Sequence, residues 1–179
     1  MTSPLATLLL VAILSGTLAP AAVVADEAVS DARETLQSFR KKDPDLTKFF
    51  QDAAGYAVFP TVGKGGLGVG GAFGKGIVFE RGEPVGRASL AQATIGFQFG
   101  GQAYSELVFF ETTRTLAAFK GGQFAFAAQA SAVAVTAGAS AHAPYRDGVA
   151  VFTLAKGGLM YEASVGGQKF QYEPFTKAP

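Results

Sequence analysis

The chain has 179 residues, 49% of them hydrophobic, with 23 glycines, one histidine and no cysteine, which suits one globular domain and excludes disulfide bonds. The formal net charge of +1 hides an asymmetry: residues 26–52 carry seven acidic and five basic side chains, a net charge of −2, whereas residues 53–179 carry ten basic and seven acidic ones, a net charge of +3. The main body is therefore mildly basic and the segment before it mildly acidic.

The first 25 residues have the character of a leader. They carry no charged side chain, and the apolar stretch from Leu5 to Leu18 has the length of a signal-peptide core rather than of a membrane span. We predict a signal peptide over residues 1–25, cleavage after Ala25, and export to the periplasm or cell envelope. Because the leader has no Lys or Arg, an uncleaved anchor is the alternative. No cysteine follows the leader, which excludes lipoprotein attachment.

Residues 26–54 are predicted to be helical. The apolar residues recur at helical spacing, and they are Ala28, Val29, Ala32, Leu36 and Phe39. Arg40-Lys41-Lys42 then supplies cations at the carboxyl end, where they suit the helix dipole. Asp43-Pro44 is typical of an N-cap followed by proline at the first helical position, so a second short helix is expected, which Gly55 ends.

From residue 55 onward the apolar period changes to two, which predicts strands: Ile95, Phe97 and Phe99 share one face, and Tyr104, Glu106, Val108 and Phe110 share another. Hairpin turns are predicted at Arg81-Gly82-Glu83-Pro84, Gly100-Gly101, Arg146-Asp147-Gly148 and Gly166-Gly167. One helix, from Glu111 to Lys120 with Gly121 as its C-cap, interrupts the strands. The expected fold is α+β: N-terminal helices, then a mostly antiparallel, Gly-rich β-barrel or β-sandwich over residues 55–174 with one intervening helix.

Lysine stands directly beside glycine at four places: Lys64-Gly65-Gly66, Gly74-Lys75-Gly76, Lys120-Gly121-Gly122 and Lys156-Gly157-Gly158. Each lysine is expected on a tight loop, where free backbone N–H groups form an anion-binding nest beside the ammonium. The predicted lipid- or phosphate-binding residues are Lys64, Lys75, Lys120, Lys156, Gly65, Gly66, Gly157 and Gly158. Plain turn chemistry, with lysine as a solubility device, is the alternative.

Nucleotide binding fits these glycines poorly. Gly66-Leu67-Gly68-Val69-Gly70-Gly71 satisfies the pattern G-x-G-x-x-G, but the segment from Phe73 to Phe79 that follows is typical of a strand, not of the helix that the fingerprint requires. Against a P-loop, Lys75 is followed by Gly76 where Ser or Thr must hold magnesium.

Catalysis also lacks support. A zinc site or a nucleophile triad needs several partners, and His142, the only histidine, is expected to be a solvated or capping residue at a loop edge. Glu106 and Glu162 could pair as acid and base, as the two carboxylates of glycosidases do. Outward-facing strand carboxylates, or partners for Arg114 or Lys156, are the favoured interpretation. We therefore expect no enzyme, metal or cofactor, and no nucleic-acid partner.

Longer strings of the sequence resemble the SYLF domain over about Ala28 to Pro174. They are Gly55-Tyr56-Ala57-Val58-Phe59-Pro60, Val62-Gly63-Lys64-Gly65-Gly66, Gly68-Val69-Gly70-Gly71-Ala72, Gly74-Lys75-Gly76, Gln92-Ala93-Thr94-Ile95-Gly96-Phe97-Gln98, Gly100-Gly101-Gln102-Ala103-Tyr104-Ser105-Glu106, Phe124, Ala130-Ser131-Ala132 and Ala155-Lys156-Gly157-Gly158-Leu159.

The resemblance implies a lipid-binding module. Eukaryotic relatives attach to phosphoinositide membranes and some bind actin, whereas bacterial relatives are commonly exported or lipid-anchored. Since an exported protein would meet neither actin nor phosphoinositides, anionic phospholipid of the envelope is the expected partner. In this hypothesis the four lysines meet lipid phosphates while the helix from Ala28 to Phe39 lays its apolar edge on the bilayer. The alternative is a structural or protein-interaction module that uses exposed aromatics such as Tyr104 and Phe175.

Overall fold

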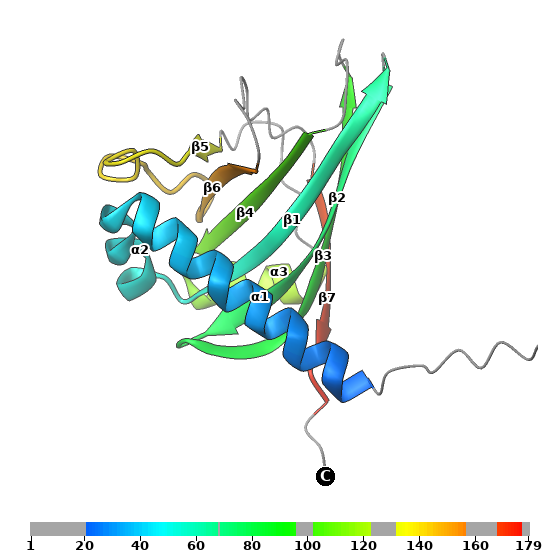
Figure 1. The fold of residues 1–179 in the computed structure, drawn as a ribbon. Coiled ribbons are helices and arrows are strands. Elements are labelled where there is room, and N and C mark those ends of the chain that lie inside the picture. The colour runs from blue at the N-terminus through cyan, green and yellow to red at the C-terminus, as the bar shows by residue number, and fades with distance from the viewer. Residues whose placement is uncertain (1–20, 68, 96–101, 123–131, 157–167, 177–179) are drawn as a thin grey trace, which may run out of the picture.

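A computed structural model of the chain describes residues 21–67, 69–95, 102–122, 132–156 and 168–176. Its helical elements are α1 (Ala21–Lys42), the 3-10 helix η1 (Pro44–Leu46), α2 (Thr47–Asp52) and α3 (Thr113–Lys120). Its strands are β1 (Gly55–Leu67), β2 (Val69–Glu80), β3 (Glu83–Ile95), β4 (Gln102–Phe110), β5 (Val133–Ala134), β6 (Val149–Lys156) and β7 (Gln168–Pro174). The predicted α+β class, with helices before a mostly antiparallel sheet, is confirmed (Figure 1).

The strands form one sheet in the order β5-β6-β4-β1-β2-β3-β7. Neighbouring strands are antiparallel except β5 and β6, which are parallel. Among the described residues the two outermost strands, β5 and β7, do not pair with each other, so the sheet is open. The finer prediction of a closed barrel or a sandwich is therefore not confirmed.

Two of the four predicted turns are found. Arg81 and Gly82 connect β2 to β3 with φ of 52° and 84°, and Asp147 and Gly148 turn the chain before β6 with φ of 51° and 77°. Residues 100–101 and 166–167 lie outside the described residues. Strands β3 and β4, on either side of residues 100–101, are not neighbours in the sheet, so the hairpin predicted between them is wrong.

Helix α1 crosses one face of the sheet, which we call the α1 face (Figure 1). Its residues Ala32, Leu36 and Phe39 are buried, and Ala28 and Val29 pack against the same core cluster. The sheet side of that cluster includes Tyr56, Val58, Ile77, Phe79 and Leu107. The predicted insertion of this helix into a bilayer is wrong for the folded domain, because its apolar edge is already packed on the sheet.

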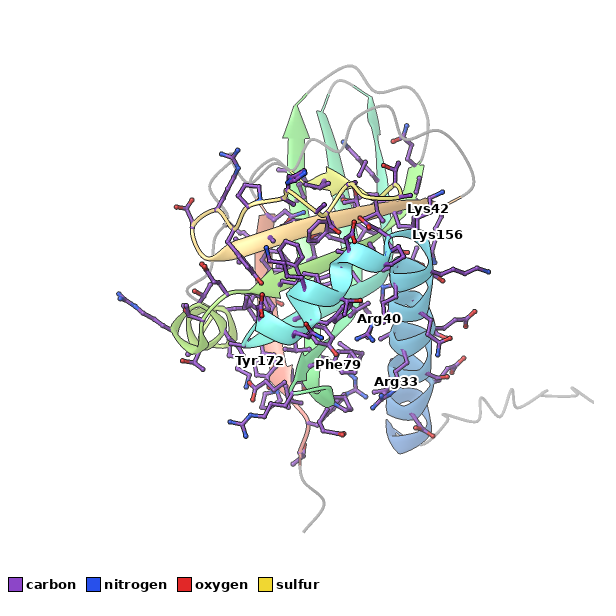
Figure 2. The ribbon with its side chains drawn as sticks, turned by 90° about the vertical axis from the view of Figure 1, so that its left-hand side faces the viewer. Arg33, Arg40, Lys42, Phe79, Lys156 and Tyr172 are labelled. Atoms are coloured by element: carbon purple, nitrogen blue, oxygen red, sulfur yellow. The ribbon has the colours of Figure 1, made fainter. Side chains whose placement is uncertain are left out.

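The flank of α1 beside α2 carries two arginines over aromatic rings. Figure 2 shows Arg33 and Arg40 along the helix, and their guanidinium carbons lie 5.7 Å from the ring centroid of Phe79 and 3.9 Å from that of Phe50. Stacking of this kind favours arginine over lysine. Among the described helices, none is both long and apolar enough to cross a membrane.

The opposite face of the sheet, the α3 face, carries a second core cluster. Helix α3 begins at the N-cap Thr112, whose hydroxyl accepts a hydrogen bond from the N–H of Thr115 at 3.2 Å. Its buried residues Leu116 and Phe119 join a cluster that includes Ala57, Phe59, Val78, Val108, Phe110 and Phe170. Both faces of the sheet are thus covered, as the continuous apolar stretch from Leu107 to Phe110 requires.

Candidate functional site

The four lysines predicted to bind phosphate do not share one surface. Lys75 lies on the α1 face, two residues from Ile77 along β2, and Lys156 lies on the same face, two residues from Leu154 along β6. Lys64 lies on the α3 face, because its partner across the strands is Ala72, a member of that core cluster. The fourth, Lys120, is at the end of α3.

Lys64 is buried, with only 8% of its surface exposed. It is a residue of strand β1 together with Gly65 and Gly66, and not of a loop. The prediction of an anion-binding nest at a tight turn is therefore wrong for this triplet. Its burial among the α3-face residues also removes Lys64 from any surface that a large partner could contact.

Lys75 is exposed, but it too lies within a strand, β2. A Cβ at the neighbouring Gly76 would come within 2.4 Å of the carbonyl oxygen of Val58 and 2.7 Å of a ring carbon of Phe59. Glycine is required there for close packing and not to bind an anion. The loop prediction is again wrong, although the ammonium of Lys75 is free to meet a ligand.

Lys120 lies at the carboxyl end of α3, with Gly121 as the helix C-cap, as predicted, and Gly122 at φ 69°. Its ammonium forms an ion pair with the carboxylate of Glu80 and lies 5.5 Å from the ring centroid of Tyr172. This lysine joins α3 to β2 and β7. The arrangement gives its charge a partner inside the protein.

Lys156 ends strand β6 and is exposed. Its Nζ donates a hydrogen bond to Oγ1 of Thr61 at 2.8 Å, and Thr61 is the cross-strand partner of Lys75. The hydroxyl of Thr61 thus lies between two of the predicted lysines. Gly157 and Gly158 lie outside the described residues.

A row of cross-strand partners crosses the α1 face of the sheet from β7 to β6. The row is Lys169 in β7, Ala91 in β3, Phe73 in β2, Gly63 in β1, Ala103 in β4 and Lys156 in β6. We call these residues together with Lys75 the arm face. With strands about 4.8 Å apart, five strand spacings separate its two end lysines by about 24 Å along the sheet.

Phe73 stands near the centre of the arm face with 55% of its surface exposed. Its neighbours there are small: Gly63 and Ala91 are its direct cross-strand partners, and a Cβ at Gly63 would meet nothing within 4 Å. The result is an exposed surface with one large apolar side chain and three lysines. The sequence predictions included Lys75 and Lys156 but missed Phe73 and Lys169, because only the pairing of strands brings them together.

A cavity of about 640 Å³ lies between α1 and strands β2, β3 and β7. Its floor consists of two rows of cross-strand partners, Lys75, Ser89 and Gln171 in one row and Ile77, Arg87 and Glu173 in the other. Ala28 and Asp31 of α1 line it from above. Because Lys75 belongs both to this cavity and to the arm face, the two adjoin.

Glu106 is fully buried on the α3 face, so the prediction that it faces outward is wrong. Its Oε2 accepts a hydrogen bond from Nε2 of Gln168 at 3.1 Å, while its Oε1, the Oε1 of Gln168 and the Oγ1 of Thr153 have no partner. Burial raises the pKa of Glu106 to about 8, against the opposing effect of the Gln168 hydrogen bond. Glu162, the predicted acid–base partner, lies outside the described residues.

Other polar and aromatic candidates are also placed. His142 is exposed in a turn, as expected. In the described part of the chain, no three His, Cys, Asp or Glu side chains group together to hold a metal ion. Tyr104 and Phe175 were both predicted to be exposed aromatics that serve a protein partner. Tyr104 is buried. Phe175 is half-buried, and the guanidinium carbon of Arg87 lies 5.3 Å from the centroid of its ring.

One family model matches the sequence. It is described as "Ysc84: Las17-binding protein actin regulator" and covers residues 91–174, from β3 to β7, a stretch that includes both end lysines of the arm face. No curated relative matches the chain. Residues 91–174 match the model of the Ysc84 (SYLF) domain family, the family that the sequence resembles.

Proposed function

We propose that this protein is a non-enzymatic module that docks on anionic phospholipid membranes through the arm face. The Ysc84 family is described by what it binds and regulates and not by a reaction, which supports a binding function. The observation that carries the proposal is the exposure of Phe73 on the sheet face that also bears Lys75, Lys156 and Lys169.

The chemistry of the arm face suits a lipid surface. A lysine near an anionic membrane contributes about 1 kcal/mol, so three lysines supply weak and salt-sensitive attraction. Burial of a phenylalanine side chain contributes about 1.5–3 kcal/mol more, which is the second, apolar signal that stable attachment needs.

We further propose that the first 25 residues direct export, so that the domain, residues 26–179, meets the membranes of the cell envelope. An apolar core without charged side chains in this leader supports the proposal. Anionic phospholipids are then the ligands that an exported lysine-bearing surface would encounter.

A protein partner is the second candidate. The description of the matched family names Las17 binding and actin regulation, which are protein interactions of that family. A single exposed phenylalanine between lysines also suits an acidic protein surface with an apolar pocket. Because the same residues serve both candidates, vesicle binding decides between them.

The test is co-sedimentation of the full chain with neutral and anionic phospholipid vesicles at low and high salt. We expect binding to anionic vesicles alone, weakened by salt. The variant in which Lys75, Lys156 and Lys169 are all changed to Gln should lose most of this binding. All variants keep the same leader, so the difference between them reports on the arm face.

A matched control removes three cations elsewhere. Lys41, Lys48 and Arg146 are exposed and lie outside the arm face, and their change to Gln lowers the net charge equally. Equal loss of binding in both triple variants would show that net charge alone is responsible. No binding to any vesicle would reject membrane docking and leave the protein partner as the function to pursue.

A further inference from the structure

The cavity between α1 and strands β2, β3 and β7 has the size and the chemistry of a ligand site. Its volume of about 640 Å³ lies within the usual range for small-ligand pockets, roughly 300–1,000 Å³. Apolar atoms of Ala28, Pro60 and Ile77 contribute to its walls, and the charged groups come from different elements.

One group of side chains on the cavity floor suits a phosphate. Lys75 and Ser89 are direct cross-strand partners, and Arg87 lies two residues from Ser89 on the same face of β3. Side chains that bear an ammonium, a hydroxyl and a guanidinium therefore stand next to one another on the floor, within the reach that neighbouring side chains on a sheet have. Arginine and lysine are the usual partners of phosphate oxygens, and a hydroxyl adds a donor.

Two carboxylates accompany these cations. Glu173 is the cross-strand partner of Arg87 in β7, and Asp31 lines the cavity from α1. Within the described ranges, none of the four charged groups forms an ion pair with another. The guanidinium of Arg87 lies over the ring of Phe175 and keeps N–H groups for a ligand.

We propose that this cavity binds the headgroup of an aminophospholipid, a phosphodiester joined to a primary ammonium as in phosphatidylethanolamine. The phosphate meets Lys75, Arg87 and Ser89, while the ammonium donates to the carboxylates of Asp31 and Glu173. This inference rests on the proposed docking function, because the arm face brings the membrane to the cavity through their shared residue, Lys75. It predicts that a primary ammonium is preferred over trimethylammonium, which has no N–H to donate.

The test is a titration of the full chain with soluble headgroups, followed by the amide signals of Asp31, Ser89 and Gln171 in ¹⁵N–¹H NMR spectra. We expect saturable shifts with glycerophosphoethanolamine and at least tenfold weaker binding of glycerophosphocholine and glycerophosphoglycerol. Equal affinity for all three, or no saturable shift at these amides, would overturn the assignment.

Two double variants separate the roles of the side chains. Asp31→Asn with Glu173→Gln should weaken binding of the ethanolamine headgroup to the level of the choline headgroup. The phosphate of both should still bind. Arg87→Gln with Ser89→Ala should lose all three headgroups. The control changes two exposed carboxylates outside the cavity, Glu83→Gln with Glu111→Gln, and should keep the preference.

Vesicle binding by the same variants distinguishes this inference from the docking function. The Asp31→Asn, Glu173→Gln variant keeps all three arm-face lysines, so it should still sediment with anionic vesicles. Vesicle binding by the wild type without any headgroup shift would reject the cavity and keep the docking. Headgroup binding without vesicle binding would reject the docking function and the membrane source of the ligand.

Discussion

Glu106 is a carboxyl group that the fold keeps away from water. Three oxygens around it, its own Oε1, the Oε1 of Gln168 and the Oγ1 of Thr153, lack a partner. A protonated carboxyl supplies a donor to this cluster, whereas a carboxylate adds an unpaired buried charge. The raised pKa of about 8 therefore means that the folded protein holds this proton at neutral pH.

Stability should depend on this proton. Because the folded-state pKa of Glu106 is raised from 4.5 to about 8, its contribution is fully present below pH 4.5 and is lost as the pH rises towards 8. The loss is at most about 1.4 kcal/mol per pH unit. The change Glu106→Gln keeps a neutral donor. The free energy of unfolding of this variant, minus that of the wild type, should therefore rise between pH 4.5 and about pH 8. Urea unfolding at several pH values measures it.

The control for this measurement is Glu111→Gln, which changes an exposed carboxylate. Its pH profile should follow that of the wild type. Parallel profiles for wild type and Glu106→Gln would show that the carboxyl of Glu106 has an ordinary pKa in the folded protein.

Gly76 illustrates how a glycine beside a lysine can serve packing. A Cβ at this position would come within 2.4 Å of the Val58 carbonyl oxygen, a distance that side chains do not tolerate. We expect Gly76→Ala to lower the free energy of unfolding by about 1–3 kcal/mol, as overpacking does. The matched change Gly63→Ala has open space around the new Cβ and should be neutral or stabilising in the same urea experiment. Equal effects would contradict the packing argument.

At the scale of elements, Asp43 joins the helical segment to the chain before β6. It caps η1, as the Asp43-Pro44 pattern predicts, by accepting from the N–H of Asp45 at 3.2 Å. It also accepts from the N–H of Gly138 at 3.2 Å and of Ser140 at 2.8 Å. Burial alone would raise its pKa, but these hydrogen bonds outweigh burial and lower it. One carboxylate thus serves as a cap and as a clamp between distant segments.

Loss of this clamp should destabilise the fold. Hydrogen bonds to a charged group contribute about 1.5–3 kcal/mol, so Asp43→Ala should reduce the free energy of unfolding by at least that amount. Because the folded-state pKa is lowered from 3.8, the contribution is present above pH 3.8 and lost below it, and the difference from wild type should shrink in acid. Asp45→Ala, at an exposed residue, is the control. Equal loss in both variants, measured by urea unfolding, would reject the clamp.

At the scale of the whole molecule, the arm face carries Phe73, the one large hydrophobic side chain that is exposed among the described residues. A phenylalanine exposed by 55% contributes nothing to the core, so Phe73→Ser should change the free energy of unfolding by less than about 0.5 kcal/mol. Vesicle binding should fall about tenfold or more, because the side chain no longer leaves water on docking. Phe73→Leu keeps an apolar side chain and should retain most of the binding. Unchanged co-sedimentation of Phe73→Ser would remove the apolar half of the proposed docking.

The sequence by itself determined the local features of this protein. Helical spacing from Ala28 to Phe39, the cap at Asp43-Pro44 and the turn at Arg81-Gly82 were all predicted, and the structure contains each of them. The family followed from ordered strings of residues, and the family model confirms it over residues 91–174. These features depend on residues close together in the chain, so their spacing is enough to reveal them.

The tertiary structure alone decided which side chains share a surface. Register in β1 shifts between Val58 and Thr61, so that Val58 and Gly63 lie on the α1 face and Lys64 lies on the α3 face. Without that irregularity, Lys64 would follow Val58 onto the α1 face, because side chains alternate with a period of two. Pro60 cannot donate a ladder hydrogen bond, and proline inside a central strand is typical of a bulge. The sequence does not give the size of the register shift, which arises from pairing with two neighbouring strands. That one irregularity places Lys64 in the interior. Together with the order of the strands, it also brings the residues of the arm face into one row.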